Sequence, residues 1–291
     1  MNATPLRPLL LLTGALMIGS YSAPGVASPG SRLWATGGVT TIEGSAGGGL
    51  TPWALLSGYA DDGEWGGSLG LSTTRVDDFS LTVAALSASA WNRVEVSFAR
   101  QHFDLDTLGA ALGQDQLEQD IFGIKMRLAG DLIYTHWGQW SLGVQHKRNR
   151  TFAIPSAVGA RDDQGTDLYL TGSKLWLAAL ADRNLLLNAG IRATKANQGG
   201  LLGFGGDRNN DYEPVFEGSL GVFLTRQWLI GAEYRQKPDN LGFAREDDWY
   251  DAFVAWVPSR DLALTAAWVN LGDIAGQNDQ RGLYLALQGS F

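Results

Sequence analysis

The sequence predicts an all-β protein, a single antiparallel up-and-down transmembrane β-barrel of about 12 to 14 strands. Three observations support this fold class: apolar and polar side chains alternate, long and short connections alternate, and the last strand ends in an aromatic residue. The composition agrees, because 38 Gly, 11 Trp, 8 Tyr and 11 Phe are typical of a β-protein rich in turns.

Alternation is clearest in residues 228–236, where Trp228 and Tyr234 share a face with the apolar residues between them and charged residues occupy the other face. Successive side chains of a strand point to opposite sides, so a period of two predicts a strand. Residues 250–256 and 53–59 repeat the pattern, again with aromatic ends. Aromatic ends fit the two interfacial belts of a membrane barrel. A soluble β-sandwich shows the same alternation and is the alternative.

Connection lengths favour the barrel. The predicted strands are 33–42, 50–59, 66–75, 79–88, 92–103, 119–129, 138–148, 166–178, 184–195, 213–224, 227–237, 247–257, 261–271 and 281–291. From the fifth strand onward, long connections alternate with short ones, as in outer-membrane barrels with loops on one side and turns on the other. Merging the glycine-rich first hairpin would leave 12 strands instead of 14.

The N-terminus has the pattern of a secretory signal peptide. Arg7 precedes a short apolar run at 9–18, and small residues lead to a predicted cleavage after Ala27. A buried N-terminal helix is the alternative, which Pro24 and Pro29 disfavour. The domains are therefore a signal peptide at 1–27 and a barrel at 28–291, exported through the periplasm to the outer membrane.

The C-terminal strand, residues 281–291, ends in Phe291, with Leu283, Leu285 and Leu287 on the face of that ring. A terminal Phe on an alternating strand resembles the signal that the barrel-assembly machinery recognises. We therefore expect that machinery as a partner, together with outer-membrane lipid and lipopolysaccharide. The formal charge of −8 becomes −9 when Arg7 leaves, which argues against nucleic acid.

The polar faces of the predicted strands carry charges of both signs. The candidate lumen-lining residues are Glu95, Lys125, Arg127, Lys174, Arg192, Glu217, Glu233, Arg235 and Asp251. Mixed charge either lines a water path and sets its ion selectivity, or forms salt bridges that fill the lumen. The first reading predicts a channel for passive or selective passage of small polar solutes. The second predicts a structural or ligand-binding barrel with functional outer loops.

An enzyme, either a hydrolase or an acyltransferase, is the least favoured function. The histidines are His102, His136 and His146, and none falls in a Ser–His–acid motif. Of the three, His102 is the least unfavourable base.

We expect no metal and no cofactor. Residues 207–211 place Asp, Asn and Asp at alternate positions, but they lack the glycine and the later Glu of a calcium loop. The glycines at 203–206 do not open a helix after a buried strand, so a dinucleotide site is not predicted.

Several stretches together resemble one family of uncharacterised Gram-negative outer-membrane β-barrel proteins, a domain of unknown function. They are EGSAGGGLTPWA at 43–54, RVEVSFARQ at 93–101, RATKANQ and LLGFGGD within 192–207, and YRQKPDNL and EDDWYD within 234–251. The resemblance spans the mature chain and implies an envelope barrel, with no activity to carry over and no oligomeric state. A shared function would be sought around the loop residues Lys195, Asn197, Asp207, Lys237, Asp239, Asp247 and Asp248.

Overall fold

A computed structural model describes residues 34, 36–105, 109 and 113–291. The predicted signal peptide, 1–27, lies outside these residues. Within the described part of the chain, no helix is both long and apolar enough to cross a membrane.

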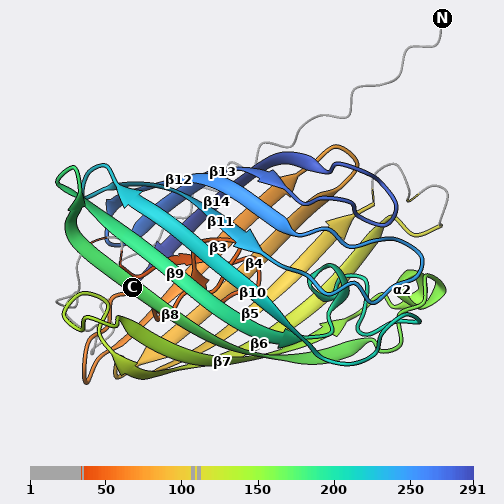
Figure 1. Cartoon of the computed structure of the whole chain (residues 1–291), viewed down its shortest axis with the longest axis horizontal. Helices are drawn as coiled ribbons and strands as arrows, with labels where there is room; N and C mark the ends of the chain where they lie inside the picture. Colours follow the sequence, from red (N-terminus) through yellow and green to blue (C-terminus); the bar gives the residue numbers. More distant parts are fainter. Residues whose placement is uncertain (1–33, 35, 106–108, 110–112) are drawn as a thin grey trace, which may run out of the picture.

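The described residues form a closed barrel of twelve antiparallel strands (Figure 1). The strands are β3 (Trp65–Arg75), β4 (Ser80–Ala90), β5 (Val94–Asp104), β6 (Gln116–Gly130), β7 (Gln139–Asn149), β8 (Gln164–Leu180), β9 (Arg183–Thr194), β10 (Glu213–Phe223), β11 (Trp228–Arg235), β12 (Trp249–Ser259), β13 (Leu262–Asn270) and β14 (Arg281–Ser290). Each strand pairs with its neighbours in sequence, and β14 pairs with β3 to close the ring. Closure leaves no strand edge unpaired, as a lipid environment requires.

The two ends of the barrel differ as the sequence predicts. One end, the short-turn end, carries tight turns such as 181–182 and 260–261, together with the C-terminus. The other, the long-loop end, carries connections such as 195–212 and 236–248. The long loops hold the short helix α2 (Ala153–Ala157) (Figure 1) and the 3₁₀ turn η1 (Asn197–Gly200).

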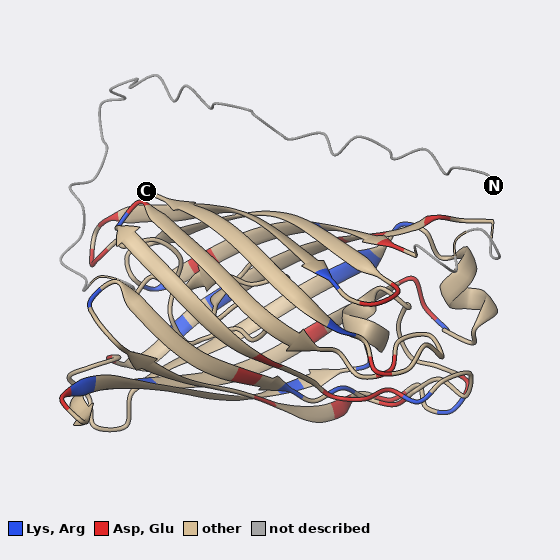
Figure 2. Cartoon of the chain, turned by 90° about the horizontal axis from the view of Figure 1, so that it is seen from above, with Lys and Arg blue, Asp and Glu red and all other residues tan. Residues whose placement is uncertain are grey.

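The outward face is apolar between two aromatic girdles. On β6, Phe122, Ile124 and Met126 are exposed, whereas the alternate residues Ile121, Gly123 and Lys125 are buried. Figure 2 shows the strands nearest the viewer free of charged residues over most of their length. The exposed tryptophans nearest the short-turn end are Trp65, Trp91, Trp137, Trp140, Trp176, Trp228 and Trp256. The exposed aromatics nearest the long-loop end are Tyr212, Phe216, Tyr234, Tyr250 and Trp268. Such girdles mark the two interfaces of a membrane barrel.

The prediction of wall strands at 33–42 and 50–59 is wrong. Residues 36–60, here called the plug, lie inside the barrel and form only the two-residue strands β1 (Val39–Thr40) and β2 (Ala46–Gly47). Trp53, Leu55 and Tyr59 are all buried. The plug is surrounded by wall on every side, so its aromatic residues are buried whatever their spacing. A period of two there does not report a sheet face.

Candidate functional site

The plug enters and leaves the barrel at the short-turn end. Near its start, Thr36 lines a cavity of about 1070 Å³ with Arg183, Arg226 and Arg260, which belong to short turns or their edges. Past its end, the Glu64 carbonyl accepts a hydrogen bond from the Trp91 amide in the β4–β5 turn. The plug is therefore a loop inserted from one side.

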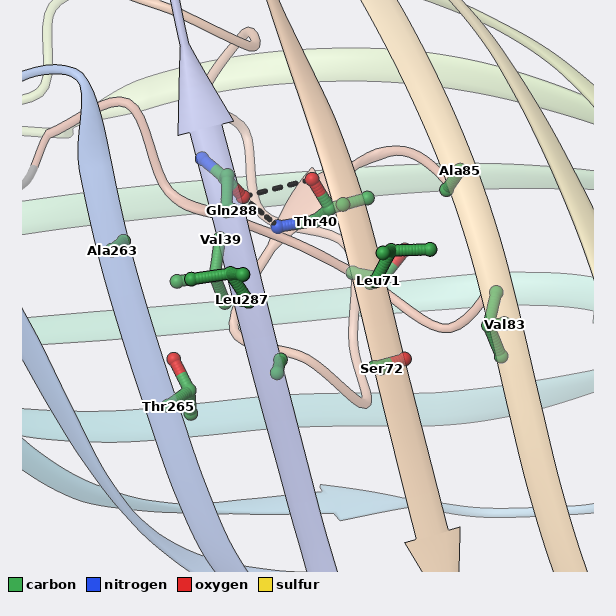
Figure 3. Close-up of a pocket in the computed structure, with 13 residues that line it drawn as sticks. Val39, Thr40, Leu71, Ser72, Val83, Ala85, Ala263, Thr265, Leu287 and Gln288 are labelled. Carbon is green, nitrogen blue, oxygen red and sulfur yellow. Dashed lines mark hydrogen bonds between the residues drawn. The ribbon is translucent and has the colours of Figure 1, made fainter. Parts of the chain in front are cut away.

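Wall side chains bind the plug through hydrogen bonds. The Gln288 Oε1 atom accepts from the Thr40 amide at 2.5 Å and from its hydroxyl at 2.8 Å (Figure 3). The hydroxyls of Thr51 and Ser219 lie 2.7 Å apart. Cavities beside the plug measure about 10 and 20 Å³, enough for one or two water molecules each. The lumen is thus filled at the level of the plug.

Five consecutive strands contribute one charged residue each to a row on the inner wall. In order from β7 to β11, these are Lys147, Asp167, Arg192, Glu217 and Arg235, so the sign of the charge alternates. Asp167 accepts from Lys147 at 2.8 Å and from Arg192 at 3.2 Å. Glu217 accepts from Arg192 at 2.7 Å and from Arg235 at 3.2 Å. The row is a continuous chain of ion pairs.

Glu43 of the plug completes this row. Its Oε1 atom lies 2.5 Å from the Lys147 ammonium and 2.6 Å from Arg235 Nη2, and its Oε2 atom lies 3.2 Å from Arg192 Nη2. These six residues, here called the hub, balance three cations against three carboxylates. Each is at most 4% exposed, so water does not screen them.

Other wall groups hold Arg192 of the hub in place. Arg192 Nη1 donates to Gln145 Oε1 at 2.7 Å, and its guanidinium lies 4.9 Å from the centre of the Tyr169 ring. That ring packs over Gly143, its cross-strand partner, where a Cβ atom would come within 2.1 Å of it. Glycine is required at this position because the aromatic ring occupies the space of a side chain.

A second buried ion pair satisfies the backbone of the plug. Lys125 lies 3.3 Å from Glu95, and its ammonium also donates to the carbonyls of Ala46 and Trp53. Glu95 accepts from the amides of Ala46 and Ser57 at 3.2 and 2.7 Å. Backbone groups of the plug, which joins no wall strand, are thus paired with wall charges.

The 195–212 loop closes the lumen above the hub. Around η1 it turns inward, so that Lys147 Nζ donates to the Gly199 carbonyl at 3.2 Å and Asn149 Nδ2 donates to the Leu201 carbonyl at 2.6 Å. Gln119 Nε2 also donates to Gly199 at 3.2 Å. The hub therefore lies between the plug on one side and this inward loop on the other.

Most of the predicted lumen residues point into the barrel and are buried: Glu95, Lys125, Arg192, Glu217, Glu233, Arg235 and Asp251. Arg127 lies at the short-turn rim and donates to the Gly130 carbonyl. Lys174 was predicted on the wrong face, because its neighbours Ser173 and Leu175 are the inward residues of β8. Its ammonium instead donates to two carbonyls of the 131–138 turn, at 2.6 and 2.8 Å.

Sequence reasoning missed three hub residues: Glu43, Lys147 and Asp167. Lys147 and Asp167 share the inward parity of Gln145 and Tyr169, so a complete list of charges at that parity would include them. Glu43 lies outside any wall strand, and no periodic signal points to it.

The predicted loop residues make contacts within the 236–248 loop and between the long loops. The contacts are Lys195 with Asp162 (2.6 Å), Asn197 Oδ1 with Asn240 Nδ2 (3.0 Å), Asp207 with the Gly242 amide (2.7 Å), Lys237 with Glu246 (3.1 Å), Asp239 with the Glu246 amide (3.3 Å), Asp247 with the Asp273 amide (3.3 Å) and Asp248 with the Lys237 amide (3.1 Å). These contacts form a cap at the long-loop end.

Lys237 and Glu246 form a buried ion pair in this cap. Burial raises the pKa of Glu246 even though Lys237 opposes the shift. Burial also lowers the pKa of Lys237, whose ammonium lies 4.9 Å from the centre of the Trp249 ring. Both directions show that desolvation outweighs the attraction between the two charges.

The other candidate chemistry lies apart from the lumen. His102 faces outward, 3.6 Å from Glu118, and His146 lies 3.0 Å from the Thr166 hydroxyl, also on the outside. No group of three or more His, Asp or Glu side chains in the described ranges is placed to hold a metal ion. The hub is therefore the candidate functional site.

The chain belongs to the family described as "Protein of unknown function (DUF3034)", which matches residues 36–288 and thus includes the plug. No curated protein sequence matches it. The structure titled "KdgM porin in complex with disordered oligogalacturonate" is similar at 11% identity and a TM-score of 0.50, covering 77% of this chain and 99% of that one. Omp33 from Acinetobacter baumannii is 10% identical, with a TM-score of 0.46, covering 78% of this chain and 98% of that one. At such identities the likeness shows the fold alone.

Proposed function

We propose that this member of the DUF3034 family is an outer-membrane channel for small polar solutes and that the plug holds it closed. The observation that carries the proposal is the hub, where one plug carboxylate is bound by three wall cations. The apolar band between two aromatic girdles supports a membrane location. The final strand ending in Phe291 is the segment that we expect the barrel-assembly machinery to bind.

The chemistry of the plug–wall contacts favours a removable plug. The plug is bound by ion pairs and side-chain hydrogen bonds in addition to the apolar packing of Trp53 and Leu55, and no plug strand joins the wall sheet. The ion pairs and hydrogen bonds contribute little net free energy, because water replaces them when they break. Part of the wall that the plug covers is polar, with Ser173, Asn188 and Ser219 facing inward, so this part can be hydrated.

The topology also favours movement. Both ends of the plug lie at the short-turn end, so the loop can leave the lumen without threading through the barrel. The alternative is a permanently filled barrel that acts through its long loops. The buried Lys237–Glu246 pair, which fixes the cap, favours that alternative, and one experiment separates the two.

The experiment is a reversible lock between plug and wall. The chain has no cysteine, and the Thr51 and Ser219 hydroxyls are 2.7 Å apart, so the T51C/S219C double variant can form a single disulfide. In planar bilayers we expect the oxidised form to stay silent and the reduced form to show discrete conductance steps. The S219C single variant, treated with the same oxidant and reductant, is the control.

Two outcomes would contradict the proposal. Equal conductance of the oxidised and reduced forms would show that the plug is not the gate. Silence of both forms across the full voltage range would favour the permanently filled barrel.

A further inference from the structure

We infer that the position of the Glu43 carboxylate is a binding site for the carboxylate of an anionic solute, for which Glu43 substitutes while the channel is closed. The inference rests on the proposed function and names its substrate class. It starts from the charge count of the wall row, in which three cations face two carboxylates. Without the plug, the row carries one uncompensated positive charge.

The order of the charges along the row directs its excess positive charge to a single position, where a ligand can bind. The alternation begins with Lys147 and ends with Arg235, and Arg192 stands midway. All three donors reach the same carboxylate, at 2.5 to 3.2 Å. A neutral solute in this place would leave a buried cation unpaired, which is costly in a desolvated site.

The donors keep their positions without Glu43. Arg192 is held by Glu217 at 2.7 Å and by Gln145, and it stacks on Tyr169. Arg235 is held by Glu217, and Lys147 by Asp167 at 2.8 Å. A site whose donors are positioned by other partners is preorganised, so a ligand binds without the cost of ordering them.

The other plug-binding carboxylates lack this arrangement. Glu95 faces one cation, Lys125, and the backbone amides of the plug. Glu233 accepts from the amides of Leu50 and Thr51 and from two hydroxyls. Of the buried wall cations described, three converge only at Glu43, and this convergence selects carboxylates over neutral polar solutes.

The first test is chemical rescue in the full-length E43A variant. We expect its barrel to unfold at a lower temperature, read by heat-modifiable gel migration, and acetate to restore the transition. Acetamide should need an about tenfold higher concentration, since one charge-assisted hydrogen bond carries about that factor. E95A, which vacates a site with one cation, is the matched control and should respond less to acetate.

Acetate that protects E43A no better than chloride at equal ionic strength, or no better than it protects E95A, would overturn the inference. This test needs no conductance, so it can fail or succeed independently of the proposed channel.

A second measurement keeps the inference testable if E43A does not fold. Thr51 is fully buried in the plug, so in T51C the rate of thiol labelling reports plug release. With Glu43 present, acetate competes for its cations and should accelerate labelling more than chloride does at equal ionic strength. Equal rates in the two salts would overturn the inference, whereas no labelling in any salt would refute plug movement and hence the proposed function.

Discussion

Replacing Arg192 with Met tests whether the hub is a balanced charge cluster. Met keeps the length and apolar volume of the stem but removes contacts with Glu43, Asp167 and Glu217. Three carboxylates would then face two cations in a site from which water is excluded.

The expected loss follows from burial. Removing one partner of a buried charge cluster costs about 3–5 kcal/mol, because an uncompensated charge stays behind. Arg100, which pairs with Asp120 at 2.7 Å on the outside and has a side chain 43% exposed, is the matched control. The R100M variant should lose less stability than R192M, because Asp120 keeps Arg150 as a partner at 2.9 Å.

The double variant R192M/E43Q shows whether the two substitutions compensate each other. It restores equality, with two cations and two carboxylates, so E43Q should recover at least about 1 kcal/mol of the R192M loss although it destabilises the parent protein. Urea unfolding in lipid vesicles, followed by tryptophan fluorescence, measures the unfolding free energies of the parent protein, R192M, E43Q and the double variant. If the two losses simply add, or if R192M matches R100M, the hub is not a balanced cluster.

Two further predictions concern the cap and the inner wall. Burial raises the pKa of Glu246 above its ordinary 4.5, so the folded state binds the carboxyl proton more tightly than the unfolded state does. The stability contributed by this group therefore falls as the pH rises through the interval above 4.5, and thermal scans should show that E246Q removes this pH dependence. A wild-type protein that gains stability relative to E246Q over the same interval would contradict the prediction. In G143A the new methyl group displaces the Tyr169 ring, which should cost about 1–3 kcal/mol of unfolding free energy. Y169F keeps the ring and should cost less; equal losses of the two variants in urea unfolding would show that the ring packing is not responsible.

The barrel was predictable from local patterns. In β11, Trp228 and Tyr234 face outward while Glu233 and Arg235 face inward, as the period of two indicates. The alternating connection lengths and the terminal strand predicted the up-and-down topology correctly, because in that topology each strand pairs with its neighbours in sequence. The count of 12 rather than 14 required knowing that residues 36–60 lie inside the barrel.

The hub was only partly predictable, because it depends on register and on insertion of the plug. Arg192, Glu217 and Arg235 were identified from parity, but their order as a row follows from how far each strand is shifted against the next. Lys174 was misplaced because charge was taken to indicate the lumen, whereas a lysine level with the start of β7 can reach the carbonyls of the preceding turn from outside. The role of Glu43 could be recognised only from the structure, which places the plug inside the barrel.

The contact between Thr40 and Gln288 joins residues 248 positions apart, across the seam where β3 meets β14. Seam pairing has already brought the chain ends together, so seating the plug closes only a short additional loop. The partners of Glu43 come from three strands, β7, β9 and β11, which pairing through β8 and β10 brings together. The site that receives Glu43 is thus complete only when these five strands are paired, and we expect the plug to be seated after them. On that order, the conducting form that we propose resembles the barrel before its plug is inserted.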